Sequence, residues 1–213
     1  MSAAQILAFP GGFSGGDEPD GSGKFIVNMF RNPSLKEATE QLLKKRDGLA
    51  IGICNGFQAL IKLGLLPFGS IEPLSENAPT LTFNNIGRHV STICRVRAAT
   101  NASAWLRYVK VGDVFSVPVS HGEGRFVCDA EALQKLVENG QILTQYVDFD
   151  DRVTMQSPFN PNGSVNAVEG LISPDGRILG KMGHAERTGK GLYRNVEGNW
   201  DMGLFRSGVE YFK

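Results

Sequence analysis

The pattern of apolar positions is clearest at residues 49–53, where it predicts a short strand. These residues are uncharged, unbroken and partly β-branched, as is typical of a strand buried on both faces of a sheet. Apolar residues then recur at helical spacing up to Leu63 and stop before Gly64, which predicts a helix. Cys54 therefore lies at the turn between a strand and a helix.

The apolar pattern before this strand predicts one more strand and two helices. Residues 5–9 form a short apolar run, and a glycine-rich loop follows it. Helices are expected at about residues 22–30 and from the capping pair Asn32-Pro33 to just before Asp47. The order strand, loop, helices, strand, helix predicts a parallel sheet with covering helices.

The glycine-rich loop, residues 10–23, follows the first strand and is expected near Cys54, because ligands bind parallel sheets beyond the carboxyl ends of the strands. The loop does not fit a nucleotide phosphate loop, since Phe25 follows Lys24 where Ser or Thr is required. The dinucleotide pattern also fails, because Ile26 stands where its third glycine belongs. The loop is either an anion cradle of backbone amides or an ordinary connection.

The second half of the chain predicts shorter, antiparallel elements. Alternating residues predict a half-buried strand at 90–96, and further strands are expected at 114–119 and 142–148, around a helix that Asp129 caps. Residues 165–184 predict a hairpin, because two apolar runs flank the turn sequence Ser-Pro-Asp-Gly.

Cys54 is a candidate nucleophile because of the glycines on either side of it. With Gly52 and Gly56 it forms the pattern glycine-x-nucleophile-x-glycine, in which the chain turns sharply from strand to helix. The amino end of a helix lowers the pKa of a thiol and offers backbone N–H groups. The alternative is a small buried cysteine at the end of a strand.

Two histidines follow predicted strands. His184 ends the hairpin, and Glu186 points the same way, so its carboxylate can bond one imidazole nitrogen and leave the other free. A thiol nucleophile needs such a base with an orienting group, although a surface His-Glu pair has the same sequence. His121, between Ser120 and Gly122, belongs either to a ligand-binding loop or to a turn with a surface histidine.

Composition narrows the class of protein. The 213 residues can bury one good core, so one domain is expected. Lys and Arg number 22, as do Asp and Glu, so no net field attracts nucleic acid or an anionic membrane. No signal peptide or membrane-length apolar run is present in the sequence. Three well-separated cysteines argue against a disulfide framework or a Cys₄ zinc site and for a reducing compartment, which we expect to be the cytoplasm.

Three segments resemble the signature motifs of class I glutamine amidotransferases: Pro10-Gly-Gly-Phe13, Gly52-Ile-Cys-Asn-Gly-Phe-Gln58 and Gly183-His-Ala-Glu-Arg187. Together with residues 120–126 and 160–164, they make the whole chain resemble the C-terminal glutaminase domains of phosphoribosylformylglycinamidine synthases. An Asp-Glu-Pro-Asp-Gly segment in the glycine-rich loop resembles the large single-chain type of these synthases. Ala185 stands where many relatives have proline, and we expect little consequence.

The resemblance implies roles for particular residues. Cys54 would be the nucleophile, His184 the general base and acid, and Glu186 the group that orients the histidine. The remaining implied residues would hold the oxyanion through backbone N–H groups (Gly12, Phe13, Asn55) or bind the amino-acid end of glutamine (Gln58, Ser120, His121, Gly122).

The resemblance also implies a fold and a wider assembly. The fold would be a three-layer, flavodoxin-like α/β arrangement with a mostly parallel sheet, flanking helices and additional antiparallel strands. Residues 1–213 would be one glutaminase domain, partial at its N-terminus because an initial strand, helix and strand are lacking. Backbone groups normally paired by the missing strand would then be left unpaired.

The implied reaction is hydrolysis of L-glutamine through a cysteine thioester, with ammonia passed to ATP-dependent formation of phosphoribosylformylglycinamidine in purine biosynthesis. The domain itself would need no metal or cofactor, while ATP and Mg²⁺ would belong to the synthase domain of the same or a partner chain. No nucleic acid or membrane partner is expected. The alternatives are a γ-glutamyl hydrolase and an inactive truncated module.

Overall fold

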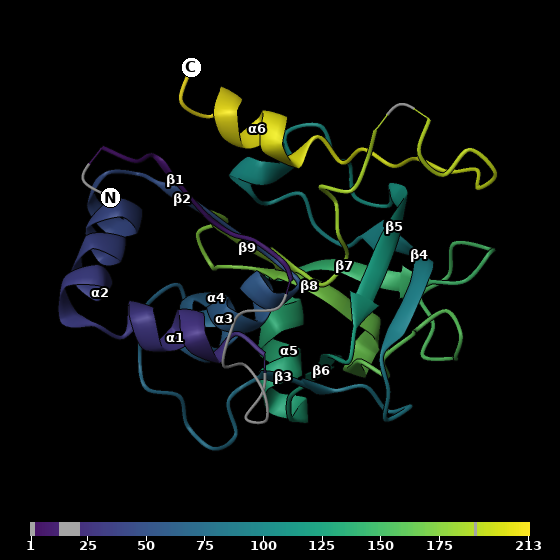
Figure 1. Ribbon diagram of the computed structural model, residues 1–213, viewed down its shortest axis with the longest axis horizontal. Coiled ribbons are helices and arrows are strands. Elements are labelled where there is room, and N and C mark those ends of the chain that lie inside the picture. Colours follow the sequence, from purple (N-terminus) through teal and green to yellow (C-terminus); the bar gives the residue numbers. More distant parts are fainter. Residues whose placement is uncertain (1–2, 13–21, 190) are drawn as a thin grey trace.

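The computed structural model describes residues 3–12, 22–189 and 191–213, which form one seven-stranded sheet, a two-stranded sheet and the helices around them (Figure 1). The strands of the large sheet, in spatial order, are β1 (Ile6–Phe9), β2 (Leu49–Ile53), β9 (Ile178–Lys181), β8 (Val168–Ile172), β7 (Ile142–Val147), β4 (Val90–Ala98) and β5 (Val114–His121). The small sheet pairs β3 (Thr80–Phe83) with β6 (Glu123–Val127). The α/β class predicted from the sequence is confirmed.

Helices cover the parallel strands, and other short helices connect the elements. The α-helices are α1 (Lys24–Phe30), α2 (Pro33–Glu40), α3 (Asn55–Leu63), α4 (Leu65–Phe68), α5 (Ala130–Glu138) and α6 (Leu204–Glu210). The π-helical turn η1 (Gln41–Lys45) continues α2, and the 3₁₀ turns are η2 (Ala104–Leu106) and η3 (Val165–Ala167). In Figure 1, α6 lies above β1, β2 and β9 while α1, α3 and α4 lie below them, which gives three layers.

The predicted caps of two helices are present. The Asn32 side chain accepts a hydrogen bond from the backbone N–H of Ser34 at 3.0 Å, and Pro33 opens α2. The Asp129 carboxylate accepts from the N–H of Ala132 at 2.7 Å at the start of α5. These side chains satisfy N–H groups that a helix leaves unpaired at its amino end.

Parallel pairing is confined to the three strands that carry the glycine-rich loop, Cys54 and His184. β1 pairs with β2 in parallel, with Phe9 opposite Gly52, and β2 pairs with β9 in parallel, with Ile53 opposite Lys181. Since the strands run the same way in matching register, the segments that follow them emerge at one edge of the sheet.

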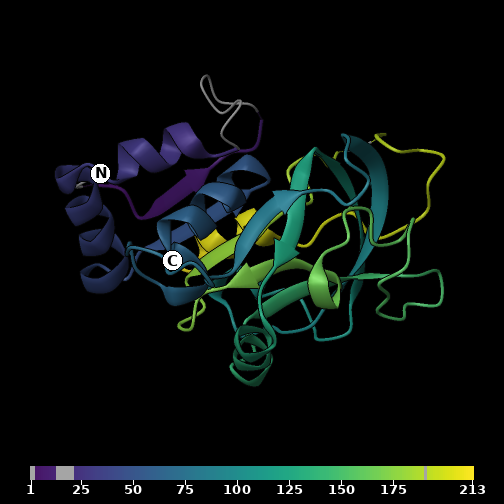
Figure 2. The ribbon, with the colours of Figure 1, turned by 90° about the horizontal axis from the view of Figure 1, so that it is seen from below.

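The rest of the sheet is antiparallel, so the parallel part is smaller than the mostly parallel sheet expected from the sequence. β8 and β9 form the predicted hairpin, and the pairs β7–β8, β4–β7 and β4–β5 are also antiparallel. A tight turn can join only antiparallel neighbours, and this hairpin reverses the direction of pairing next to β9. Figure 2 shows the N-terminal helices at one end of the molecule and the antiparallel strands toward the other.

α3 packs closely on the parallel strands because glycines allow it. A Cβ atom added to Gly56 would lie 2.0 Å from the carbonyl oxygen of Phe9, and one added to Gly180 would lie 2.2 Å from a ring atom of Phe57. Both distances are far below van der Waals contact. Small residues at these points therefore set the depth of α3 against β1 and β9, and with it the position of the Cys54 turn.

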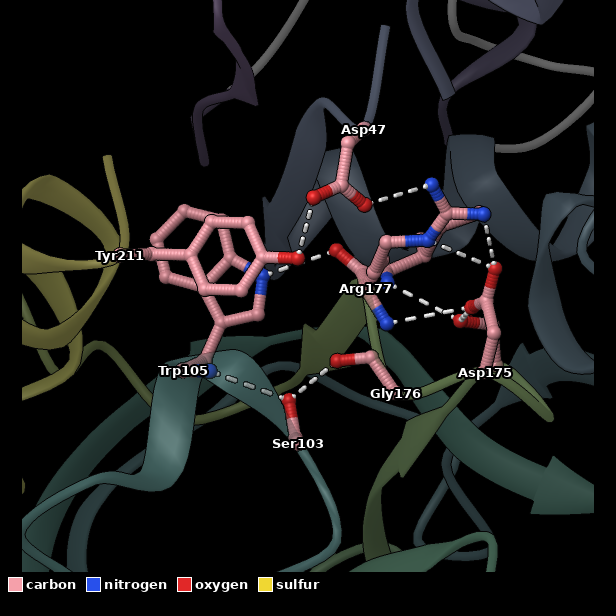
Figure 3. Close-up of polar contacts among 9 residues, drawn as sticks. Asp47, Ser103, Trp105, Asp175, Gly176, Arg177 and Tyr211 are labelled. Atoms are coloured by element: carbon pink, nitrogen blue, oxygen red, sulfur yellow. Dashed lines mark hydrogen bonds and ion pairs between the residues drawn. The ribbon is translucent and has the colours of Figure 1, made fainter. Parts of the chain in front are cut away.

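The opposite end of the parallel strands is held by a cluster of side chains, the terminal cluster, drawn in Figure 3. Asp47, which precedes β2, accepts a hydrogen bond from the Tyr211 hydroxyl at 2.8 Å and pairs with Arg177 at 3.2 Å. Arg177 precedes β9 and also pairs with Asp175 at 2.7 Å, while its carbonyl accepts from the Trp105 indole at 3.0 Å. The cluster joins the C-terminal segment to the sheet at the end remote from Cys54.

β1 is an edge strand of the sheet that the described residues form, bonded to β2. Phe9 is buried, and Ile6 and Leu7 are half-buried. That the chain lacks preceding strands stays a prediction, as does its assignment as a single partial domain. Among the described residues, no helix is both long and apolar enough to cross a membrane.

Candidate active site

Cys54 lies at the predicted turn between β2 and α3, in a backbone conformation that side chains rarely adopt. Its φ is 52° and its ψ is −107°, outside the regions favoured by residues with a Cβ atom. The turn is held because the Cys54 N–H donates to the carbonyl of Lys181 at 2.8 Å and the Cys54 carbonyl accepts from Gln58 at 3.0 Å. A Cβ on Gly52 would lie 2.8 Å from the backbone of Gly56, so this sharp turn needs both glycines.

Burial makes Cys54 a weak acid, and backbone amides partly oppose this. Loss of solvent raises the pKa of the Cys54 thiol to about 11, although the N–H groups of Asn55 and Gly12 and the nearby charge of Arg187 favour the thiolate. Glu186 acts in the opposite direction. The thiol is therefore protonated at neutral pH, so nucleophilic attack requires a base that takes its proton.

His184 and Glu186 form the imidazole–carboxylate pair that the sequence suggested. Nδ1 of His184 lies 2.6 Å from Oε1 of Glu186, and this hydrogen bond holds the pKa of the Glu186 carboxyl below its usual value although partial burial raises it. The carboxylate accepts from Nδ1–H, so Nε2 carries the free lone pair. Only 1% of His184 is exposed, so the alternative of a surface His-Glu pair is wrong.

Gly11 brings the cysteine and the histidine together. A Cβ atom added to Gly11 would lie 2.8 Å from Cε1 of His184 and 3.3 Å from Cβ of Cys54. The backbone of Gly11 therefore fills the space beside both side chains, and any larger residue would push them apart. We did not single out Gly11 from the sequence, although the Pro-Gly-Gly segment was its signal.

Nε2 of His184 is buried and has no hydrogen-bond partner in the part of the chain that the structure describes. The backbone N–H of the same residue donates to Pro118 at 2.9 Å, which fixes the residue while leaving the ring nitrogen unused. A buried nitrogen without a partner costs free energy, and such groups are typical of sites that await a substrate or a reacting proton.

A cavity of about 150 Å³ connects these groups. Its lining contains nearly all of the predicted site residues: Gly12, Cys54, Asn55, Gln58, Ser120, His121, Gly122 and His184. Ser22, Glu123 and Arg187 also line it and were not predicted as site residues. Glu186 does not line the cavity and acts on His184 from the side, while Phe13 lies outside the described residues.

Partly buried hydrogen bonds connect the predicted substrate-binding residue Gln58 to neighbouring segments. The side-chain amide of Gln58 donates to the carbonyl of Glu123, and the Glu123 carboxylate accepts from the N–H of Ser22 at 3.1 Å. The ammonium of Lys62 donates to the carbonyl of Ser22 at 2.6 Å. The end of the glycine-rich loop is therefore attached to both α3 and the β5–β6 turn.

His121 is buried at the end of β5, so the alternative of a surface histidine is wrong. The Asn84 amide nitrogen donates to the carbonyls of His121 and Arg88, which leaves its oxygen to accept from Nδ1–H of His121 at 3.1 Å. Nε2 of His121 is therefore the acceptor nitrogen of the ring, and none of the described residues donates a hydrogen bond to it. Burial, followed by the charge of His89, lowers the pKa of His121 to about 4.

Ser120, which the resemblance implied as a glutamine-binding residue, contacts both His89 and Cys54. Its hydroxyl is 3.0 Å from Nε2 of the exposed His89, and its carbonyl lies 3.9 Å from the Cys54 sulfur.

Among the described residues, no group of three or more His, Cys, Asp or Glu side chains could hold a metal ion.

Comparisons with known proteins point to one family. The family model of the CobB/CobQ-like glutamine amidotransferase domain matches residues 1–212. The phosphoribosylformylglycinamidine synthase subunit PurQ of Methanococcus maripaludis (strain C7) is 34% identical over 233 residues, covering 100% of this chain and 82% of that protein. PurQ of Aquifex aeolicus is 35% identical over 204 residues, covering 93% of this chain and 79% of that protein.

The solved structure of PurLQS from Thermotoga maritima shares the fold. It superposes with a TM-score of 0.71 at 24% identity, covering 100% of this chain and 82% of the matched chain.

Proposed function

Because this chain belongs to the CobB/CobQ-like glutamine amidotransferase family, we propose that it hydrolyses L-glutamine to glutamate and ammonia through a thioester on Cys54. The observation that carries the proposal is the buried, unbonded Nε2 of His184 in the cavity of Cys54, with Glu186 on the other ring nitrogen. A thiol with a raised pKa needs such a base.

In the first half of the reaction, the Cys54 thiol gives its proton to Nε2 of His184 as the sulfur attacks the side-chain amide carbon. The negative charge that forms on the amide oxygen would be held by the backbone N–H groups of Gly12 and Asn55, which already favour the thiolate form of Cys54. One such donor contributes about 3–4 kcal/mol in hydrolases. His184 then returns the proton to the leaving nitrogen, the C–N bond breaks, and ammonia departs.

In the second half, water gives a proton to His184 and attacks the thioester carbon. The C–S bond breaks, the proton returns to the sulfur, and glutamate leaves. Glu186 stabilises the imidazolium that forms transiently in both halves. Each residue therefore ends the cycle in its starting protonation state.

The cavity suits the amino-acid end of glutamine. Glu123 and Arg187 contribute one charge of each sign to its lining, which complements the ammonium and the carboxylate of the substrate. Gln58 and the segment Ser120–Gly122 supply hydrogen-bonding groups, including the acceptor Nε2 of His121. We assign these residues to substrate binding.

We further propose that the ammonia is used in ATP-dependent formation of phosphoribosylformylglycinamidine, in the cytoplasm. The support is the identity of 34–35% with proteins named as the PurQ subunit of phosphoribosylformylglycinamidine synthase. ATP and Mg²⁺ would bind to the synthase part, in the same or a partner chain. The large single-chain type of synthase stays a prediction.

The test compares Cys54→Ala with a matched control, Cys94→Ala, in an assay of ammonia release from glutamine. Cys94 is also buried but lies on β4, away from the cavity lining. We expect the first variant to lose all turnover and the control to keep it. Turnover by Cys54→Ala would refute the assignment, and cleavage of a γ-glutamyl peptide in preference to glutamine would favour a γ-glutamyl hydrolase instead. Failure of a glutamine-analogue electrophile to label Cys54 in the wild type would indicate an inactive module.

A further inference from the structure

A buried ion pair lies behind the site, and the proposed mechanism does not use it. Nζ of Lys181, the last residue of β9, is 2.9 Å from Oε1 of Glu169 on the neighbouring strand β8. Both side chains are 0% exposed, and neither lines the cavity. Complete burial of a lysine and a glutamate is rare and expensive, so the pair requires an explanation.

The pair bonds both backbone polar groups of Gly183, the residue next to the proposed base. Oε1 of Glu169 accepts from the backbone N–H of Gly183 at 2.5 Å, and Nζ of Lys181 donates to the carbonyl of Gly183 at 3.2 Å. Gly183 directly precedes His184 and lies beyond the end of β9 at Lys181. Its carbonyl also accepts from the backbone N–H of Ala185 at 3.1 Å, whereas its N–H is bonded by the Glu169 carboxylate.

The pair is itself fixed in place. The hydroxyl of Thr144, on β7, donates to the second carboxylate oxygen of Glu169, and the carbonyl of Glu169 accepts from the N–H of Met182 at 3.1 Å. A Cβ on Gly183 would lie 2.5 Å from Val117 and 2.8 Å from the Glu169 carboxylate. Gly183 is therefore enclosed between β5 and the ion pair, with little freedom to shift.

Stability alone does not explain the pair. Apolar side chains of similar size at the two positions would avoid the cost of removing two charges from water, and replacing buried ion pairs in this way is often neutral or stabilising. What apolar side chains could not do is hold the N–H and the carbonyl of Gly183.

We propose that Glu169 and Lys181 are positioning residues, which hold the backbone of Gly183 and thereby aim Nε2 of His184 at Cys54. This role rests on the proposed function, because it takes His184 as the base of the thiol reaction. A displacement of about 1 Å in a reacting group can cost about 100-fold in rate. The gain from the pair is therefore expected in the chemical step rather than in glutamine binding.

The test is the double variant Glu169→Ala/Lys181→Met. It removes both side-chain contacts with the Gly183 backbone and both buried charges together. We expect kcat per folded molecule to fall about 10- to 100-fold, while KM for glutamine stays within about threefold because the residues that line the cavity are unchanged. A kcat within about twofold of the wild type, measured on the folded fraction, would overturn the proposal. The matched control is Glu131→Ala/Lys135→Met, an exposed pair on α5 with a 2.6 Å contact, which should leave kcat unchanged.

A second variant separates positioning from folding. Glu169→Gln/Lys181→Met keeps an amide oxygen that can accept from the Gly183 N–H, so its kcat should lie between those of the wild type and the first variant. If the first variant does not fold, this one decides: a kcat more than about twofold below that of the wild type supports the proposal, and an unchanged kcat refutes it.

A measurement that does not depend on turnover separates this inference from the proposed function. If the wild type releases no ammonia from glutamine, the proposed function itself is refuted. The ¹⁵N resonances of the His184 ring report its position in either case. They should broaden or shift in Glu169→Ala/Lys181→Met and remain in place in the exposed-pair control, whereas an unchanged His184 spectrum in the first variant would exclude the positioning role.

Discussion

Nδ1 of His184 lies 2.6 Å from Oε1 of Glu186, and this contact fixes which nitrogen of the imidazole is available to Cys54. The histidine is buried while the carboxylate side chain is 38% exposed, so the pair joins the cavity to the surface. An imidazolium formed during reaction would be stabilised by a carboxylate that solvent partly screens.

Replacing this carboxylate by an amide tests its electrostatic role. Glu186→Gln keeps the shape of the side chain but removes the charge that stabilises the imidazolium. We expect kcat for glutamine to fall about 10- to 100-fold with little change in KM. Solvent partly screens the charge of Glu186, so the lower end of this range is expected. The measurement is steady-state ammonia release, and an unchanged kcat would exclude stabilisation of the imidazolium by the charge of Glu186.

Gly11 should not tolerate a side chain. In Gly11→Ala the new methyl group would meet Cε1 of His184 at 2.8 Å and Cβ of Cys54 at 3.3 Å, so the thiol and the imidazole must separate. We expect a loss of at least about 10-fold in kcat. Gly189→Ala is the matched control, because its nearest neighbour would be a leucine side chain at an ordinary 3.5 Å. Equal activity of the two variants would contradict the packing argument.

The acid stability of the protein should depend on His121. Burial lowers its pKa from the model-compound value of 6.5 to about 4, so the unfolded chain binds a proton more readily between these values. Stability is then fully present above about pH 6.5 and is lost as the pH falls toward 4, by about 3 kcal/mol in total. Urea unfolding of wild type and His121→Gln across this range should show a shallower pH dependence in the variant. Parallel curves would indicate that His121 does not titrate in this way.

The terminal cluster should affect stability without affecting chemistry. Tyr211→Phe removes the hydroxyl that donates to Asp47 at 2.8 Å. We expect the free energy of unfolding to fall by about 0.5–1.5 kcal/mol. The kcat should be unchanged, because Asp47 and Arg177 precede β2 and β9 and so lie at the opposite end of these strands from Cys54. Denaturant unfolding and the glutaminase assay on the same preparation check both halves of the prediction.

Much of the local structure could be predicted from the sequence. The strand at 49–53, the turn at Cys54 and the following helix depend on neighbouring residues only, as does the hairpin around Ser173–Gly176. The structure contains each of them. The pairing of His184 with Glu186 could also be foreseen, because the two residues are close along the chain.

What the sequence by itself determined is therefore most of the larger elements, although not β3, β6, α4 and α6, and the residues that follow each parallel strand. Only the tertiary structure decided how those strands lie side by side, and hence that Gly11 touches both Cys54 and His184. It alone showed that His121 is buried and that Lys181 meets Glu169 in the interior. The physical reason is that burial and partner choice are set by contacts between segments distant along the chain, and local periodicity carries no record of those contacts.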